Sequence, residues 1–167
     1  MKEMTKANLE AAFAGESQAY MKYLIFADVA EKDGFPEAAR LFRAIGHAER
    51  VHATNHLKQL GGIGKTPDNL TTAFSGEHYE VTEMYPAFDA VAKLQGEKGA
   101  IRSFYYANEA EKIHEVMFKE AHATITSGSD IESAHIYICP VCGHTHIGEA
   151  PDKCPVCGVP KDRYLEF

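Results

Sequence analysis

The feature that most constrains the fold of this 167-residue chain is an internal repeat. The segment LEAAFAGE at 9–16 resembles LTTAFSGE at 70–77, and the tetrad Glu-x-x-His at 49–52 recurs at 111–114. Similarity at an offset of 61 or 62 residues indicates that one supersecondary unit is present twice. Apolar residues in both copies follow a helical period, which makes the unit a helix pair. The repeat therefore predicts four antiparallel helices with pseudo-twofold symmetry.

Start and stop signals give the expected bounds of these helices. We expect segments from about Thr5 to the KDGFP turn, from Pro36 to Leu60, from Asp68 or Asn69 onward, and from about Glu97 to Thr126. Pro86 lies inside the third segment, and its missing N–H predicts a kink or an irregular turn there.

The character of the sequence changes after residue 128. The polar stretch SGSDIES at 127–133 indicates a linker, which we expect at 129–134. Residues 135–167 contain β-branched and aromatic residues, Pro, Gly and Cys without a helical period, which indicates a second, small domain. The expected fold is mainly α, with a four-helix bundle at 1–128 followed by a small β domain of zinc-ribbon type.

Composition and charge exclude several classes of protein. Hydrophobic residues make up 45% of the chain, so a sizeable core is possible and disorder is not expected. The net charge of −7 argues against nucleic acid as a partner, because phosphate backbones need a basic face. The N-terminal MKEMTKANLE lacks the apolar region of a signal peptide, and no apolar run approaches the roughly 18 residues of a membrane helix. We therefore expect a cytoplasmic protein without membrane segments.

Carboxylates and histidines of the helices suggest a metal site. Residues three apart share one face of a helix, so each Glu-x-x-His pair points one way. A single pair is common on a solvated surface, but two pairs at matching places in a repeat are a stronger signal. The other two segments supply Glu16 and the series Glu77, Glu80 and Glu83. A Glu from each of two helices and a Glu-x-x-His from each of the others is the arrangement of di-iron and di-manganese bundles.

An ordinary bundle with surface charges is the alternative reading, and the surroundings of Glu16 argue against it. Its neighbours include Phe13, Tyr20, Tyr23 and Leu24, which is an unusual place for a solvent-facing acid. Burying several carboxylates is prohibitive unless cations are present. Oxygen donors with one imidazole per metal suit iron or manganese better than structural zinc.

All four cysteines of the chain lie in two copies of the sequence CPVC. The pattern is Cys139-x2-Cys142-x11-Cys154-x2-Cys157, which predicts a tetrahedral four-sulfur site. In a reducing compartment such pairs favour metal over disulfide. The spacing alone fits zinc or iron. A redox-active metal pair in the bundle needs electrons, and iron can deliver them singly whereas zinc cannot. We therefore expect one iron, with zinc as a possible substitute.

Several segments match one known family in order. AFAGESQAYMKY, AERVHATNH, GEHYEVTEMYP, EAEKIH and YICPVCG…CPVCG resemble motifs of the rubrerythrins, over essentially the whole chain. The resemblance implies a ferritin-like di-iron bundle followed by a rubredoxin-like domain whose four cysteines hold a single iron. The implied di-iron ligands are Glu16, Glu49, His52, Glu80, Glu83, Glu111 and His114. Glu49 and Glu111 would bridge the metals, and His52 and Glu83 would exchange at one iron as the redox state changes.

Two features of the third segment do not fit this assignment smoothly. The internal repeat aligns Glu77, and not Glu80, with Glu16, so Glu77 is a second choice of ligand. The family often has a tyrosine five residues after the second Glu of this segment. Counted from Glu83, that position is Phe88.

The resemblance implies reduction of hydrogen peroxide to water in defence against oxidative stress. Electrons would pass through the four-cysteine iron. Because no GxGxxG fingerprint is present, they would come from an external donor, rubredoxin or an NAD(P)H-linked reductase. The alternatives are a ferroxidase that handles iron as ferritins do, and a zinc-stapled scaffold without redox activity.

The connector between the second and third helices predicts the assembly. In a ferritin-like arrangement these helices run parallel, so the connector must climb roughly 33 Å. Residues 61–68 reach at most about 30–32 Å when fully extended. We therefore expect a domain-swapped homodimer. Each site would take Glu16, Glu49 and His52 from one subunit and Glu80, Glu83, Glu111 and His114 from its mate.

Overall fold

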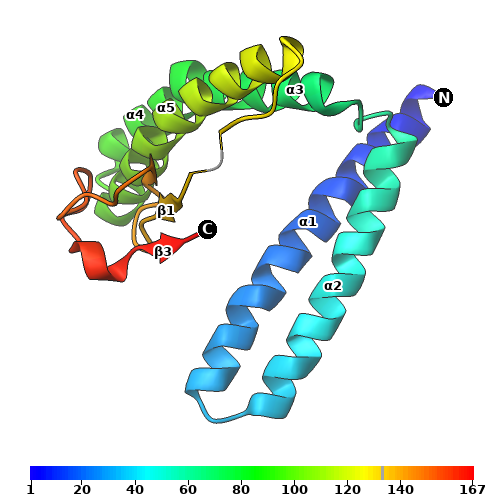
Figure 1. Ribbon diagram of the computed structural model, residues 1–167. Coiled ribbons are helices and arrows are strands. Elements are labelled where there is room, and N and C mark those ends of the chain that lie inside the picture. Colours follow the sequence, from blue (N-terminus) through cyan, green and yellow to red (C-terminus); the bar gives the residue numbers. More distant parts are fainter. Residues whose placement is uncertain (133) are drawn as a thin grey trace. The chain divides into compact units, whose positions relative to one another are not determined.

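A computed structural model describes residues 1–132 and 134–167 of the chain (Figure 1). It divides into two compact units, Met1–Gly64 and Lys65–Phe167. Each unit contains one copy of the sequence repeat, and each is described by itself below. Within the described residues, no helix is both long and apolar enough to cross a membrane.

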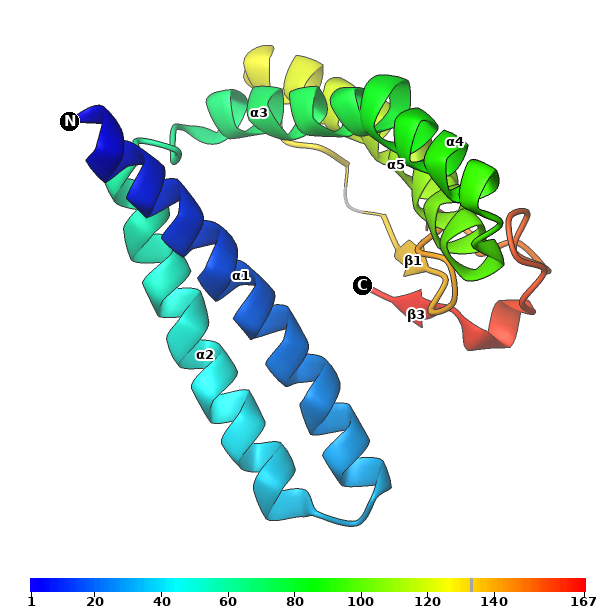
Figure 2. The same cartoon turned by 180° about the vertical axis from the view of Figure 1, so that it is seen from behind.

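The first unit is an antiparallel hairpin of α1 (Glu3–Lys32) and α2 (Pro36–Gln59), which Figures 1 and 2 show from opposite sides. Gly34 ends α1 with φ of 83°, a left-handed conformation that suits glycine. Pro36 then begins α2, where the N–H it lacks would have no helical partner. The predicted turn and both predicted segments are confirmed to within two residues.

Small side chains hold the two helices close together. Ala27, Ala30 and Ala39 form a buried cluster, and Phe42 packs against it. Larger apolar side chains remain exposed on this unit, among them Ile25, Phe26 and Val29. Two helices alone cannot enclose their apolar residues, so several large apolar side chains of this unit are exposed.

The second unit begins with a helix that is interrupted once. α3 (Thr66–Tyr79) passes into a π-helical turn, η1 (Glu80–Met84), and continues as α4 (Tyr85–Gln95). Pro86 follows the π turn directly, as expected from its missing N–H, so the predicted irregularity is confirmed. After Gly96 the chain returns as α5 (Lys98–Thr126), which packs against α3 and α4.

The start of α3 differs from the expected position at Asp68 or Asn69. The helix begins at Thr66, because the Asp68 carboxylate accepts a hydrogen bond of 3.2 Å from the backbone N–H of Lys65. Asp68 therefore stabilises the first turn from inside the helix instead of preceding it.

A small β domain completes the second unit. Its strands are β1 (Ile136–Ile138), β2 (Thr145–Ile147) and β3 (Leu165–Glu166), and a short 3-10 helix, η2 (Lys161–Arg163), precedes β3. The sheet is antiparallel, in the order β2-β1-β3, and β2 packs against α5. The mainly α fold class with a small metal domain is therefore confirmed.

Replacement of Gly34 tests the turn between α1 and α2. We expect Gly34→Ala to lower the free energy of unfolding by about 1–2 kcal/mol, because alanine is strained at positive φ. Urea unfolding followed by circular dichroism measures the loss. Gly15→Ala is the matched control, since Gly15 lies within α1 with open space around it. This change should be neutral or stabilising, and an equal loss in both variants would refute the explanation.

Candidate metal centres

Side chains suited to metal binding gather at three places among residues 1–132 and 134–167. Within each cluster, one possible ligand atom per residue lies within 4.8 Å of the others. The clusters are Glu16, Glu49 and His52; Glu77, Glu111 and His114; and Cys139, Cys142, Cys154 and Cys157.

The first cluster lies within the α1–α2 hairpin. Glu16 comes from α1, and Glu49 and His52 share one face of α2. His52 Nδ1 lies 2.9 Å from a Glu49 carboxylate oxygen and 3.9 Å from one of Glu16. Gly46, one turn before Glu49, is buried and leaves room for a tyrosine of α1. The His52 side chain is 52% exposed, so this cluster is open on one side.

The second cluster repeats the first within the other unit. Glu77 comes from α3, and Glu111 and His114 come from α5. His114 Nδ1 lies 2.5 Å from a carboxylate oxygen of Glu111. This cluster is more enclosed, since the Glu111 and His114 side chains are 18% and 27% exposed. The same chemistry, a Glu opposite a Glu-x-x-His, is therefore present once in each unit.

Protons hold the second cluster together in the absence of cations. Burial and a hydrogen bond with Glu111 raise the pKa of Glu77 to about 7. Burial and the charge of Glu111 also raise the pKa of Glu80. The hydrogen bond between His114 and Glu111 lowers the pKa of Glu111 and raises that of His114. A divalent cation would replace these protons, so the donor set fits iron or manganese.

Five of the predicted ligands lie in the two clusters, three in the first and two in the second, but the third helix differs from the expectation. Glu77, the second choice, joins Glu111 and His114, while Glu80 lies close enough for their charges to affect its pKa. Glu83 is exposed and is not part of the cluster. The π turn that begins at Glu80 explains this, because the wider turn rotates Glu83 away from the side that carries Glu77. The internal repeat, which aligned Glu77 with Glu16, was the signal for this residue.

Tyr85 borders the second cluster, and sequence reasoning had not singled it out. Burial, followed by the charges of Glu80 and Glu111, raises its pKa, so the hydroxyl keeps its proton. Tyr85 stands five residues after Glu80. Phe88, the position counted from Glu83, instead packs on Phe104 with ring centroids 5.7 Å apart.

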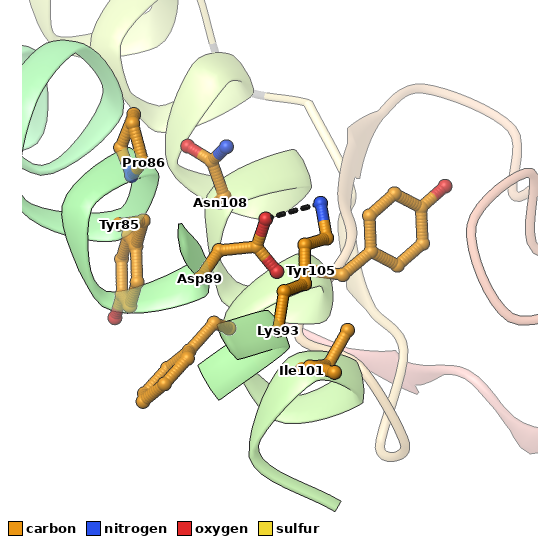
Figure 3. A pocket seen from close by; sticks show the side chains of 8 residues that line it. Tyr85, Pro86, Asp89, Lys93, Ile101, Tyr105 and Asn108 are labelled. Atoms are coloured by element: carbon orange, nitrogen blue, oxygen red, sulfur yellow. Dashed lines mark ion pairs between the residues drawn. The ribbon is translucent and has the colours of Figure 1, made fainter. Parts of the chain in front are cut away.

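A cavity of about 400 Å³ lies on another side of Tyr85, between α4 and α5 (Figure 3). Asp89 and Lys93 form an ion pair of 2.5 Å at its wall. The side-chain oxygen of Asn108 is buried there without a hydrogen-bond partner among the described residues. Tyr85 therefore lines a partly polar cavity and also lies near the carboxylates of the second cluster.

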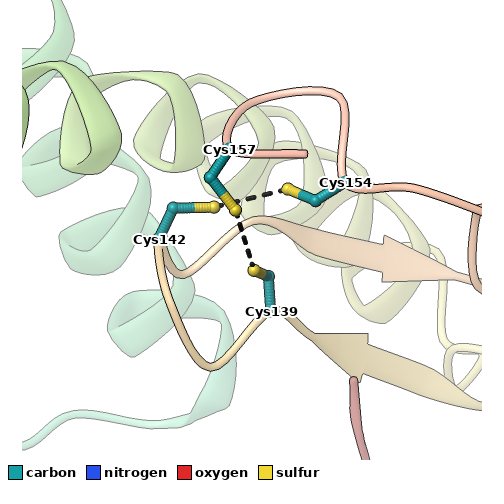
Figure 4. Close-up of side chains that lie close together, drawn as sticks. All are labelled: Cys139, Cys142, Cys154 and Cys157. Carbon is teal, nitrogen blue, oxygen red and sulfur yellow. Dashed lines mark hydrogen bonds between the residues drawn. The ribbon is translucent and has the colours of Figure 1, made fainter. Parts of the chain in front are cut away.

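The cysteine cluster has the dimensions of a tetrahedral site (Figure 4). The Sγ atoms of Cys139 and Cys157 lie 3.5 Å apart, and those of Cys142 and Cys154 lie 3.4 Å apart. Four sulfurs bound to one ion at about 2.3 Å lie about 3.8 Å from each other, so the thiols are nearly in place.

Turns with glycine at their ends present these sulfurs. Gly143 and Gly158 have φ of 79° and 77°, and their N–H groups bond to the carbonyls of Cys139 and Cys154. Burial acts to raise the pKa of the Cys154 thiol. Hydrogen bonds from the Tyr164 hydroxyl and two backbone N–H groups outweigh burial and lower it to about 6. A thiolate is thus favoured in the cluster before any metal arrives.

The raised pKa values predict how the stability of the metal-free protein depends on pH. The pKa of Glu77 is raised from 4.5 to about 7, and that of His114 is raised above 6.5. Groups with raised pKa values contribute stability while protonated and lose it as pH rises through the folded-state pKa. We therefore expect the urea midpoint of the metal-free protein to decrease as pH rises from about 4.5 to about 7 because of Glu77, and to decrease further above pH 6.5 because of His114. Glu77→Gln should reduce this fall and Glu83→Gln should not, whereas a rising midpoint would contradict the analysis.

Comparison with known proteins agrees with this arrangement. The family model described as Rubrerythrin matches residues 7–122, and that of the rubredoxin-like domain of rubrerythrin matches residues 137–164. Rubrerythrin-2 of Clostridium acetobutylicum is 42% identical, in an alignment that covers 98% of this chain and 97% of the relative. Nigerythrin of Nitratidesulfovibrio vulgaris is 35% identical, over 98% of this chain and 86% of the relative.

Solved structures of nigerythrin are similar as well. The structure of a mixed-valence state has a TM-score of 0.57 and 32% identity, and covers 98% of this chain and 86% of its own. The two Glu/His clusters and the four cysteines thus correspond to a di-iron-type site and a rubredoxin-like site. The chain belongs to the rubrerythrin family.

Proposed function

We propose that the protein reduces hydrogen peroxide to water at its di-iron site, with electrons that enter through the four-cysteine iron. One observation carries the proposal: the cysteine domain contacts the helix that holds Glu111 and His114. His114 Nε2 lies 2.7 Å from Thr145 Oγ1, and Tyr106 of α5 packs against the buried cysteines. A cysteine domain that only stabilised the C-terminal segment would not need to contact His114, a candidate metal ligand.

The proposed di-iron ligands differ from the initial expectation in one residue. They are Glu16, Glu49, His52, Glu77, Glu80, Glu111 and His114. Glu77 replaces Glu83 because it lies with Glu111 and His114, whereas Glu83 is exposed. With Glu80 as the second Glu, the tyrosine expected five residues later is Tyr85, and no departure from the family pattern remains.

The residues around the site supply charge balance and protons. Breaking the O–O bond of one peroxide and releasing two waters consumes two electrons and two protons. An iron pair held by these residues would supply both electrons. Tyr85 keeps its hydroxyl protonated and lies beside the carboxylates, so it can donate a hydrogen bond to the substrate or a proton to a neighbouring carboxylate.

A domain-swapped dimer is the proposed assembly. α2 continues ten residues beyond Glu49 and α3 begins eleven before Glu77, so an in-chain connection between parallel helices must climb roughly 32 Å. Residues 60–65 reach at most about 25 Å. The exposed apolar side chains of α1 and α2 also call for a partner surface. Each complete site would then combine one subunit's first cluster with its mate's second cluster.

Reduction in the cell would depend on an external donor. We propose rubredoxin or an NAD(P)H-linked reductase as that donor, and the cytoplasm as the compartment, since its reducing conditions keep four cysteines available for metal. Iron storage with ferroxidase activity is the competing function, and the next experiment distinguishes it from peroxide reduction.

Matched variants of the third helix test the activity and the ligand assignment together. Anaerobically reduced, iron-loaded protein is mixed with one equivalent of hydrogen peroxide, and the ferric–thiolate band of the cysteine site is followed by stopped flow. We expect the band to appear rapidly and bleach again with NADH and a reductase. Glu77→Gln should bind less iron and slow the step about 100-fold, while exposed Glu83→Gln should match the unchanged protein. Oxidation by O₂ with mineral retention and no response to peroxide would favour the ferroxidase.

Complementation between two inactive variants tests the dimer. One carries Glu16→Gln and Glu49→Gln, and the other carries Glu77→Gln and Glu111→Gln. Refolded together at equal amounts, half of the swapped dimers contain both chains, and each of these has one intact site of two. The mixture should recover about a quarter of the unmodified activity. Without swapping every site keeps an altered half, so a mixture that stays inactive would refute the arrangement.

A further inference from the structure

Thr145 forms the hydrogen bond that links the cysteine domain to the helical metal site. It lies in β2, three residues after Cys142, and only 4% of its surface is exposed. Its Oγ1 lies 2.7 Å from Nε2 of His114 and 3.1 Å from the backbone carbonyl of Gly143. The hydroxyl is therefore enclosed between a candidate metal ligand and the turn that presents Cys142.

The direction of these hydrogen bonds follows from the single proton of the hydroxyl. Thr145 donates to the Gly143 carbonyl, which can only accept. Its oxygen must then accept from His114, so Nε2 of His114 carries a proton. The other ring nitrogen, Nδ1, faces Glu111 and the cluster. A histidine ligand binds metal through one nitrogen while the partner of the other nitrogen fixes its tautomer and orientation.

Close packing keeps Thr145 in this position. Ala110 of α5 is 2% exposed, and a Cβ built on Gly143 would lie 3.8 Å from the Ala110 Cβ. The cysteine turn therefore lies beside the helix one turn before His114, close enough that a side chain at position 143 would contact Ala110. A larger residue at position 110 would move β2, and Thr145 with it, away from the imidazole.

We propose that Thr145 is a positioning residue for the di-iron site. It holds His114 as the tautomer that presents Nδ1 to the metal, and so makes metal binding in the helices depend on the folded cysteine domain. This inference rests on the proposed assignment of His114 as a ligand. The cysteine domain therefore has a second role, in the geometry of the helical site as well as in electron supply.

Nuclear magnetic resonance of zinc-loaded protein with ¹⁵N-labelled histidine tests the proposal without any turnover. We expect long-range ¹H–¹⁵N spectra to show Nδ1 of His114 bound to metal and a slowly exchanging proton on Nε2. Thr145→Val keeps the size of the side chain but cannot accept the hydrogen bond. It should speed exchange of that proton at least tenfold and weaken zinc binding in the helices about 10–100-fold.

Two controls and a second test variant accompany Thr145→Val. Thr145→Ser should restore slow exchange and affinity. Thr124→Val removes a hydroxyl that bonds only to the Glu120 carbonyl within α5 and should change neither. Thr145→Ala gives the same readout should the valine variant fail to retain metal in its cysteines.

The results distinguish the proposed role of Thr145 from the assignment of His114 as a metal ligand, on which that role rests. Unchanged exchange and affinity in the valine and alanine variants, or metal on Nε2 of His114, would overturn the role of Thr145. Absence of any metal-bound nitrogen on His114 in the unmodified protein would instead overturn its assignment as a ligand, and with it the proposed site.

Discussion

Concentrated negative charge is the constraint on which the rest of the structure depends. Glu77, Glu80 and Glu111 lie close enough to alter one another's pKa values, and His114 lies among them. Carboxylates at this spacing are stable only with protons or cations between them. The first unit repeats the problem with Glu16 and Glu49. Each helix pair is therefore a scaffold that holds carboxylates close together, and protons or metal cations must neutralise their charge.

Much of this could be predicted because the signals were local. Gly34 and Pro36 fixed the turn of the first hairpin, and Pro86 marked the irregular turn of the third helix. The cysteine spacing predicted the sulfur cluster, since each sulfur pair is positioned by a tight turn of neighbouring residues. The repeat predicted that the two Glu-x-x-His tetrads have equivalent surroundings.

The remaining features depend on geometry that no local pattern contains. Glu77, Glu80 and Glu83 are equally spaced in sequence, and only the π turn decides which of them share a side of the helix. Asp68 resembled a residue that precedes a helix, but its carboxylate bonds backwards from within the first turn. Thr145 and His114 are 31 residues apart, and their contact depends on how the cysteine domain sits on α5.

The π turn also has a consequence for how this segment tolerates change. The wider turn accommodates one residue more than a regular helix would, and each residue of an α-helix advances the chain by about 100°. If this stretch were wound as a regular α-helix with all of its residues kept, Tyr85 and all of α4 would be carried around the axis and away from the carboxylates. The π turn therefore sets the side that Tyr85 and α4 face: removal of its one extra residue leaves them in register, whereas rewinding the same residues as a regular helix does not.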